Sequence, residues 1–82
     1  MNVIGRLLKE YRIKKNITQE ELAELLNITP RQVQRIESGE SRPSLRTLKL
    51  LIEILEISCE DVVKIIKEIA KNLRIDFNEA GP

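Results

Sequence analysis

Four side chains able to read a nucleic-acid base lie close together near the middle of the chain. They are Arg31, Gln32, Gln34 and Arg35, and no acidic residue stands among them. A guanidinium group can donate two hydrogen bonds to the O6/N7 edge of guanine, and a glutamine amide can pair with the N6/N7 edge of adenine. If one helix presents these groups to the major groove, which is about 12 Å wide, they would read base sequence.

Other kinds of chemistry find little support in the 82 residues. The chain has no histidine and a single cysteine, Cys59, so an internal disulfide and a cysteine-rich zinc site are both excluded. The sequence contains no Gly-rich phosphate loop and no catalytic arrangement around a serine or cysteine. Only Tyr11 and Phe77 are aromatic, too few for a platform that stacks single-stranded bases. We therefore expect no enzyme, no cofactor and no bound metal.

Length and hydropathy predict one small domain away from membranes. A chain of this size can bury only one modest core. No apolar run approaches the roughly 18 residues of a membrane helix, and the start does not resemble a signal peptide. One cysteine fits a reducing compartment, so a cytoplasmic location is expected.

The periodicity of apolar residues predicts an all-α fold, a compact five-helix bundle. The expected helices cover about 2–15, 19–26, 30–38, 45–55 and 58–73, within a single domain of residues 1–73 followed by a flexible tail, 74–82. Ser and Thr caps precede four of them, two within capping boxes. These caps and boxes are Thr18 with Glu21, Thr29 with Gln32, Ser44 and Ser58.

The connection between the second and third predicted helices has only three residues, 27–29. Such a short connection makes two helices cross steeply, which defines a helix-turn-helix unit. The second helix would turn Leu22, Ala23, Leu25 and Leu26 toward the core. The third needs only Val33 and Ile36 to seat it, which leaves its polar face outward.

With these residues in register, the segment 8–57 resembles the lambda-repressor-like helix-turn-helix family, the phage-repressor or xenobiotic-response-element type. The resemblance implies a bundle of four or five helices that binds specific sequences of double-stranded DNA, usually as a two-fold dimer. Members of the family are repressors, antitoxins or other transcriptional regulators. The matching residues are Arg12, 17–23, 28–30, Val33, 36–39, 42–44 and 48–55.

The same resemblance implies a role for individual residues. Base contacts would come from Arg31 and Arg35, with Gln32 and Gln34 at the edges of the reading face. Many family members carry glutamine where this chain has Pro30, so that contact is lost here. Arg12 and Glu37 match a pair that in some members forms a buried ion pair. Contacts to the DNA backbone would come from Thr18, Gln19, Thr29, Arg42, Ser44 and Arg46.

Charge is distributed unevenly along the chain, although the formal total is only +1. Residues 1–46 carry nine basic and six acidic side chains, a net charge of +3, whereas residues 47–82 carry five basic and seven acidic, a net charge of −2. The cationic half contains the predicted reading helix. Moderate charge of this kind predicts that specificity depends on base contacts and dimerisation rather than on general attraction to phosphates.

An aliphatic stripe toward the C-terminus leaves two interpretations open, an intramolecular core or a homodimer interface. The favoured function is a repressor that occupies operator DNA as a homodimer. One alternative is an antitoxin whose C-terminal part holds a toxin protein, and another is a protein–protein adaptor that has lost DNA binding. The candidate interface residues are Leu50, Ile54, Val62, Ile66, Ile69 and Leu73.

Overall fold

The computed structural model describes residues 3–72, and five α-helices account for most of this range. The all-α prediction is confirmed, and the second, third and fourth helices have the predicted bounds. The predicted first helix ended one residue later than the observed one, and the predicted fifth helix began one residue earlier. Asn2, Leu73 and the predicted tail 74–82 lie outside the described residues. The helices are α1 (Val3–Lys14), α2 (Gln19–Leu26), α3 (Pro30–Ser38), α4 (Leu45–Leu55) and α5 (Cys59–Asn72).

Side-chain caps explain where α2 and α3 begin. The Thr18 hydroxyl accepts from the Glu21 backbone N–H at 3.0 Å, and the Glu21 carboxylate accepts from the Thr18 N–H at 2.9 Å. The same reciprocal pair forms between Thr29 and Gln32, at 3.1 and 2.8 Å. Each box satisfies two backbone N–H groups that the helix itself leaves unpaired.

Left-handed residues explain where the same helices end. Asn27 follows α2 with φ of 58°, and Gly39 follows α3 with φ of 89°. Glycine and asparagine tolerate this conformation better than other residues do. Two further residues are left-handed, Asn16 after α1 and Glu56 after α4. Asparagine is a residue type that tolerates this conformation, whereas the glutamate gives no such signal in the sequence.

All five helices contribute to one hydrophobic core. Leu55 of α4 and Ile65 of α5 are completely buried, and Leu8, Leu22 and Leu51 are nearly so. The prediction for Leu25 is wrong, because this side chain is 56% exposed. An eight-residue helix has room for a narrow buried stripe only, and Leu22, Ala23 and Leu26 already fill it in α2.

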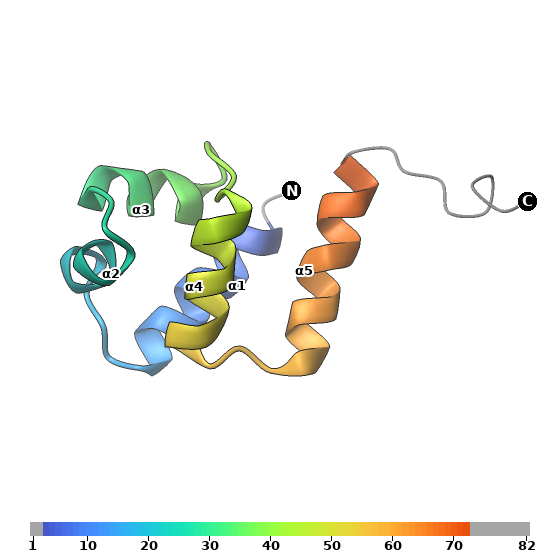
Figure 1. Cartoon of the computed structure of the whole chain (residues 1–82), viewed down its shortest axis with the longest axis horizontal. Coiled ribbons are helices and arrows are strands. Elements are labelled where there is room, and N and C mark those ends of the chain that lie inside the picture. Colours follow the sequence, from blue (N-terminus) through green and yellow to red (C-terminus); the bar gives the residue numbers. More distant parts are fainter. Residues whose placement is uncertain (1–2, 73–82) are drawn as a thin grey trace, which may run out of the picture.

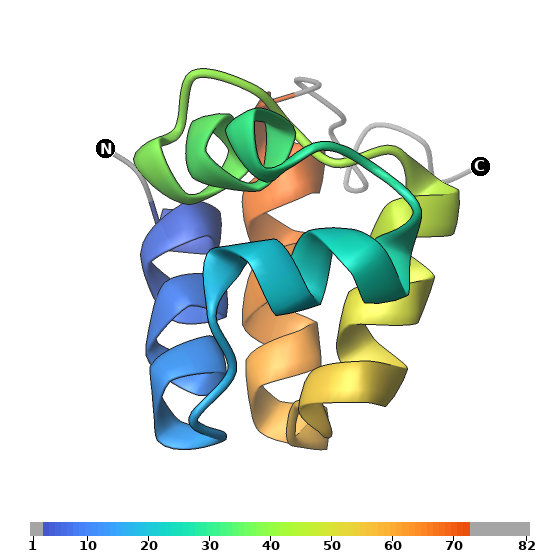
Figure 2. The ribbon, with the colours of Figure 1, turned by 90° about the vertical axis from the view of Figure 1, so that its left-hand side faces the viewer.

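Helices α1, α4 and α5 stand alongside one another, while α2 and α3 lie across one side of this group (Figures 1 and 2). Helix α5 lies on the side of the bundle away from α2 and contacts α1. This arrangement places α3 at a corner of the molecule, where one of its faces can pack and another can meet solvent.

Polar contacts fasten the start of α5 to α1. The Tyr11 hydroxyl donates to the Asp61 carboxylate at 2.5 Å and accepts from the Ser58 backbone N–H at 3.2 Å. Nearby, Lys15, which directly follows α1, pairs with Glu56 in the turn before α5. These contacts hold the first turn of α5 against the bundle. Ile65, one turn further along the helix, continues the packing.

Candidate nucleic-acid interface

The turn between α2 and α3 is built from three residues. Asn27 takes the left-handed conformation, and the Ile28 N–H donates to the Ala23 carbonyl at 3.0 Å, which closes the end of α2. Thr29 then starts α3 with extended backbone angles. In Figure 1, α2 is seen end-on whereas α3 lies in the plane of the view, so the two helices cross steeply. This is the helix-turn-helix geometry.

Helix α3 divides sharply into a buried and an exposed face. Val33 is 2% exposed and Ile36 8%, and with Glu37 they seat the helix on the core. The predicted base-reading side chains all fall on the exposed face. They are Arg31, Gln32, Gln34 and Arg35.

A buried polar network connects α3 to α1 and α2. The Arg12 Nε donates to Glu37 Oε2 at 2.6 Å and its Nη2 donates to Oε1 at 3.1 Å. Gln19 Nε2 donates to the same Oε1 at 3.0 Å, and Arg12 Nη1 donates to the Ile17 carbonyl at 2.8 Å. Each partner fills a donor or acceptor that would otherwise be buried unpaired, so the network fixes the position of α3 relative to both other helices.

The network changes the expectation for Gln19. Sequence reasoning assigned this side chain to a DNA phosphate, but its amide nitrogen is already bonded to Glu37. An amide nitrogen has two hydrogens, so one N–H remains for another acceptor. Gln19 thus holds α3 in place first, and any phosphate contact uses the remaining hydrogen.

The capping box similarly limits Gln32. Its carbonyl oxygen accepts from the Thr29 backbone N–H at 2.8 Å and from the Thr29 hydroxyl at 3.3 Å, which uses both of its lone pairs. Bidentate pairing with adenine needs both the oxygen and the nitrogen of a glutamine amide. While the box is intact, Gln32 has only its N–H₂ donors to offer. The side chain of Gln34, in contrast, makes no hydrogen bond with any residue of the range 3–72.

The two arginines of the exposed face differ in their surroundings. Arg31 forms no ion pair within the described part of the chain. Arg35 Nε donates to the Glu40 carboxylate at 3.2 Å, and both side chains are more than half exposed. Glu40 follows the left-handed Gly39 directly, and sequence reasoning gave it no role. An acidic residue placed just after the stop of the reading helix was the signal that could have found it.

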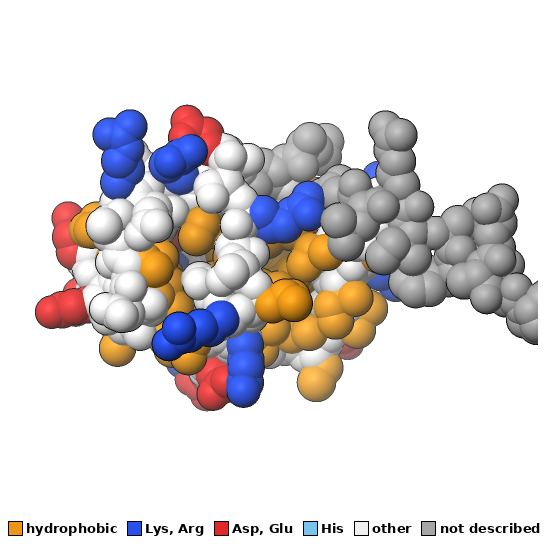
Figure 3. All heavy atoms as spheres, turned by 45° about the horizontal axis from the view of Figure 1, so that its top comes forward, with side chains coloured by type: hydrophobic (Ala, Val, Ile, Leu, Met, Phe, Trp, Pro, Cys, Tyr) orange, Lys and Arg blue, Asp and Glu red, His pale blue; other side chains and the backbone are white. Residues whose placement is uncertain are grey.

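The predicted backbone-contact residues fall into two groups. Thr18, Thr29 and Ser44 cap α2, α3 and α4, so each hydroxyl oxygen already accepts a backbone N–H. Arg42 and Arg46 are exposed and carry their charge into solvent. Seen from above α3, basic side chains are spread over this face rather than merged into one patch (Figure 3).

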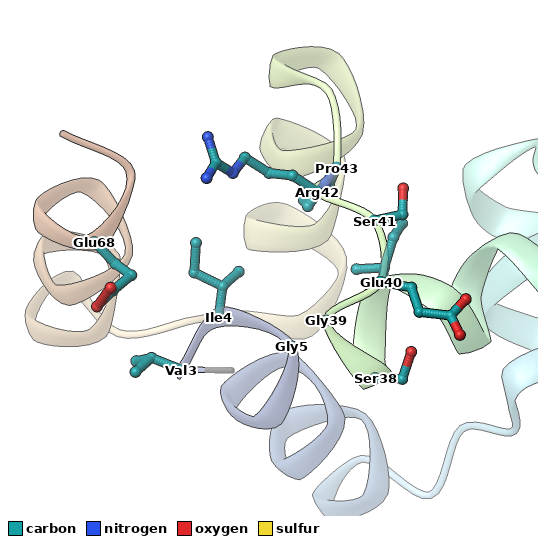
Figure 4. Close-up of a pocket in the computed structure, with 11 residues that line it drawn as sticks. Val3, Ile4, Gly5, Ser38, Gly39, Glu40, Ser41, Arg42, Pro43 and Glu68 are labelled. Atoms are coloured by element: carbon teal, nitrogen blue, oxygen red, sulfur yellow. The ribbon is translucent and has the colours of Figure 1, made fainter. Parts of the chain in front are cut away.

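A polar hollow of about 420 Å³ lies beside the turn that follows α3. It is bounded by the start of α1, residues 38–43 and Glu68 of α5. In Figure 4, Arg42 extends over this hollow above Ile4, whereas Glu40 points to the other side of the turn, toward α3. Two side chains of opposite charge thus extend to opposite sides of the same turn.

The predicted dimer residues do not form a buried cluster. Ile66 is 57% exposed, and Leu50, Ile54, Val62 and Ile69 are half-buried around the core. Val63, which sequence reasoning did not include, is 47% exposed on the same helix as Ile66. The fully buried member of the α5 stripe is Ile65, which belongs to the core. Leu73 lies outside the described residues.

Within residues 3–72, no group of three or more cysteine or acidic side chains is placed to hold a metal ion. No helix in that range is long and apolar enough to cross a membrane.

Comparison with known proteins places this geometry in a family. A family model described as helix-turn-helix matches residues 8–62, which include α2, α3 and α4 complete. The SPbeta prophage-derived uncharacterized HTH-type transcriptional regulator YonR of Bacillus subtilis is 34% identical over 62 residues, covering 76% of this chain and 57% of YonR. An uncharacterized HTH-type transcriptional regulator of Archaeoglobus fulgidus is 33% identical, covering 67% of this chain and 78% of that protein.

A third relative, the HTH-type transcriptional activator BcrR of Enterococcus faecalis, is 30% identical over 56 residues. The alignment covers 68% of this chain but only 28% of BcrR. The chain thus spans little more than half the length of YonR and less than a third of BcrR.

Solved structures agree with the sequence relatives. A mutant of the restriction-modification controller protein C.Esp1396I is similar with a TM-score of 0.64 and 29% identity, covering 92% of this chain and 95% of that one. The clp gene regulator ClgR from Corynebacterium glutamicum has a TM-score of 0.69, covers 89% of this chain and 84% of ClgR, and at 24% identity supports the fold alone. The chain therefore belongs to the lambda-repressor-like helix-turn-helix family, whose members are DNA-binding regulators rather than enzymes.

Proposed function

We propose that this chain binds specific sequences of double-stranded DNA and regulates transcription as a repressor that occupies operator DNA as a homodimer. The observation that carries the proposal is the division of α3 into two faces. Val33, Ile36 and Glu37 anchor the helix in the core, while the guanidinium groups of Arg31 and Arg35 project outward from it. A helix held this way can enter the major groove with its donors facing base edges.

The side chains around α3 divide into base-reading and positioning groups. Arg31, Arg35 and Gln34 would contact bases, with Gln32 restricted to donation by its capping role. Phosphate contacts would position the helix without reading sequence. We assign these to the free N–H of Gln19, to Arg42 and Arg46, and to the caps Thr18, Thr29 and Ser44.

The apolar surface that the core leaves uncovered supports a homodimer. Ile66 and Val63 are about half exposed on α5, and Leu50, Ile54, Val62 and Ile69 are covered only in part. Pairing this surface with a second copy would remove it from water. Two copies related by a two-fold axis would present their α3 helices to successive major grooves about 34 Å apart.

Repression needs no more than occupation of the DNA, which the described surface can supply. The relative BcrR is named an activator, but most of its length has no counterpart in this chain. The structural neighbour C.Esp1396I is named a controller protein of a restriction-modification system. A transcription reaction from a promoter that contains the bound site would separate repression from activation by the sign of the change.

The deciding experiment is an unbiased selection of bound duplexes from random DNA with the full chain. We expect an enriched inverted repeat with half-sites about one helical turn apart. The variant Arg31→Ala/Arg35→Ala should lose the enrichment while it keeps its melting temperature. Lys9→Ala/Lys14→Ala on α1, which removes the same charge, should keep the enrichment.

Failure of the wild-type chain to enrich any sequence, at low as well as physiological salt, would overturn the proposal and favour the adaptor alternative. Enrichment of a single half-site would instead contradict the homodimer and leave the rest of the proposal standing. Stable co-purification with a second small protein bound to α5 would favour the antitoxin alternative.

A further inference from the structure

The carboxylate of Glu40 is the one acidic group that the described structure pairs with a base-reading arginine. Glu40 Oε2 accepts from Arg35 Nε at 3.2 Å, and the two side chains are 66% and 51% exposed. Neither the buried network nor the helix caps involve Glu40. An acidic side chain on a surface meant for DNA carries an electrostatic cost, so its placement needs a separate explanation.

The backbone of the turn holds Glu40 where it meets Arg35. Gly39 adopts a left-handed conformation, which reverses the chain at the end of α3. The Arg35 carbonyl then accepts from both the Ser41 N–H and the Ser38 hydroxyl, each at 3.1 Å. Glu40 is therefore fixed against the last turn of α3, and its side chain points toward that helix (Figure 4).

The geometry of the pair leaves the reading edge of Arg35 free. Glu40 engages Nε, and no described residue engages Nη1 or Nη2. A guanidinium binds the O6/N7 edge of guanine with two N–H groups in a fixed fork. Holding the guanidinium at Nε reduces the number of orientations that its outer edge can take before DNA arrives.

We propose that Glu40 is a specificity-determining residue that acts through Arg35. It orients the guanidinium of Arg35 for a guanine, and its carboxylate competes for that guanidinium with the phosphates of unrelated DNA. Both effects increase the ratio of specific to non-specific affinity. This inference rests on the proposed DNA-binding function and adds to it the residue that sets discrimination.

The role does not depend on folding stability. An ion pair with both partners exposed contributes little to stability, so replacing Glu40 should leave the fold intact. The substitution Glu40→Gln keeps the size of the side chain and its carbonyl acceptor while removing the charge. Glu60→Gln is the matched control, because it changes net charge equally and lies at the start of α5, at the end of the bundle away from α3 (Figure 1).

The test uses two duplexes of equal length and composition. The first is selected from random DNA with the wild-type chain, and the second is a scrambled version of the first. Dissociation constants are measured for the full chain at several salt concentrations. With Glu40→Gln we expect tighter binding to the scrambled duplex, no matching gain on the selected duplex, and a specificity ratio lower by about threefold to tenfold. Glu60→Gln should leave the ratio unchanged.

A double-variant comparison separates the role of Arg35 from that of charge alone. In an Arg35→Ala background, Glu40→Gln should change both affinities by the same factor, so the ratio should no longer respond to it. If Glu40→Gln leaves the ratio unchanged in the wild-type background while the wild-type chain still discriminates, this inference fails and the proposed function stands. If the wild-type chain discriminates between no duplexes, both are overturned.

Discussion

The guanidinium of Arg12 and the carboxylate of Glu37 form a two-point ion pair in the interior, with Nε–Oε2 at 2.6 Å and Nη2–Oε1 at 3.1 Å. They come from α1 and α3 and are 9% and 7% exposed. Gln19 of α2 adds a third bond to the same carboxylate. One buried carboxylate therefore joins three helices and determines how α3 lies on the bundle.

Glu37→Ala should lower the free energy of unfolding by about 3–5 kcal/mol, because it leaves the Arg12 charge buried without its partner. That is a large part of the stability of so small a domain. Urea or thermal denaturation measures the change. Glu40→Ala, which breaks an exposed ion pair, should change it little.

The double variant Arg12→Met/Glu37→Leu should regain much of this loss, because it strands no charge. A melting curve for Glu37→Ala that matches the wild type would contradict burial of the pair.

Arg31→Ala should weaken binding to the selected duplex by about 1–3 kcal/mol and relax the preference at one base pair. Arg31 is exposed and has no ion pair in the described part of the chain, so its guanidinium is available without a competing partner. Repeating the selection with the variant identifies the base pair. An equal loss of affinity on selected and scrambled duplexes would mean that Arg31 contacts phosphate instead.

Arg42→Ala should weaken binding to all duplexes by a similar factor and reduce the slope of log K against log salt by about one. The reason is that a phosphate contact releases counterions but reads no base. Titrations at four or more salt concentrations give the slope. Lys14→Ala, at the end of α1 opposite α3, removes the same charge and should leave the slope unchanged. Equal slopes for the two variants would contradict a phosphate contact by Arg42.

Ile66→Glu should shift the chain toward the monomer, since a charge would enter the proposed apolar interface. Ile66 is 57% exposed in the single chain, so the fold should survive. Analytical ultracentrifugation across micromolar concentrations reports the shift. Leu25→Glu offers a control, because Leu25 is 56% exposed on α2. A wild-type chain that remains monomeric at high micromolar concentration would contradict the interface.

The contact between Tyr11 and Asp61 should make stability sensitive to acid. The hydrogen bond from the tyrosine hydroxyl holds the pKa of Asp61 below its ordinary 3.8. A carboxyl whose folded-state pKa is lowered contributes stability that is fully present above the ordinary value and is lost as pH falls through the lower one. The contribution should therefore be intact at neutral pH and should decline once the pH falls below about 3.8.

Comparing the wild type with Tyr11→Phe isolates this effect. The wild type should melt higher at neutral pH, and the difference should shrink as the pH is lowered into the acid range. Glu21 and Glu56 also have lowered pKa values, through their bonds to Thr18 and Lys15, but they titrate alike in both chains and cancel. A difference that does not depend on pH would assign the stabilisation to the bond that the hydroxyl accepts from the Ser58 N–H, and not to Asp61.

Local signals alone were enough to predict α2, α3 and the turn between them. The two capping boxes, Asn27 and Gly39 act over three or four residues, so the bounds of these helices can be derived without knowing the fold. The apolar spacing gave Val33 and Ile36 as the seat of α3 in the same way. The outward polar face, and with it the candidate site, follows from the same short-range pattern.

Tertiary structure alone decided which partners those side chains have. Gln19 bonds to Glu37 across 18 residues, and Tyr11 bonds to Asp61 across 50. Leu25 is exposed although its neighbours are buried, and Ile65 is core while Ile66 is not. Local spacing fixes which face of a helix a residue occupies, but only the packing of other helices determines what that face meets. The bond of Gln19 to Glu37 and the pairing of Glu40 with Arg35 depend on such contacts, which is why spacing alone could predict neither.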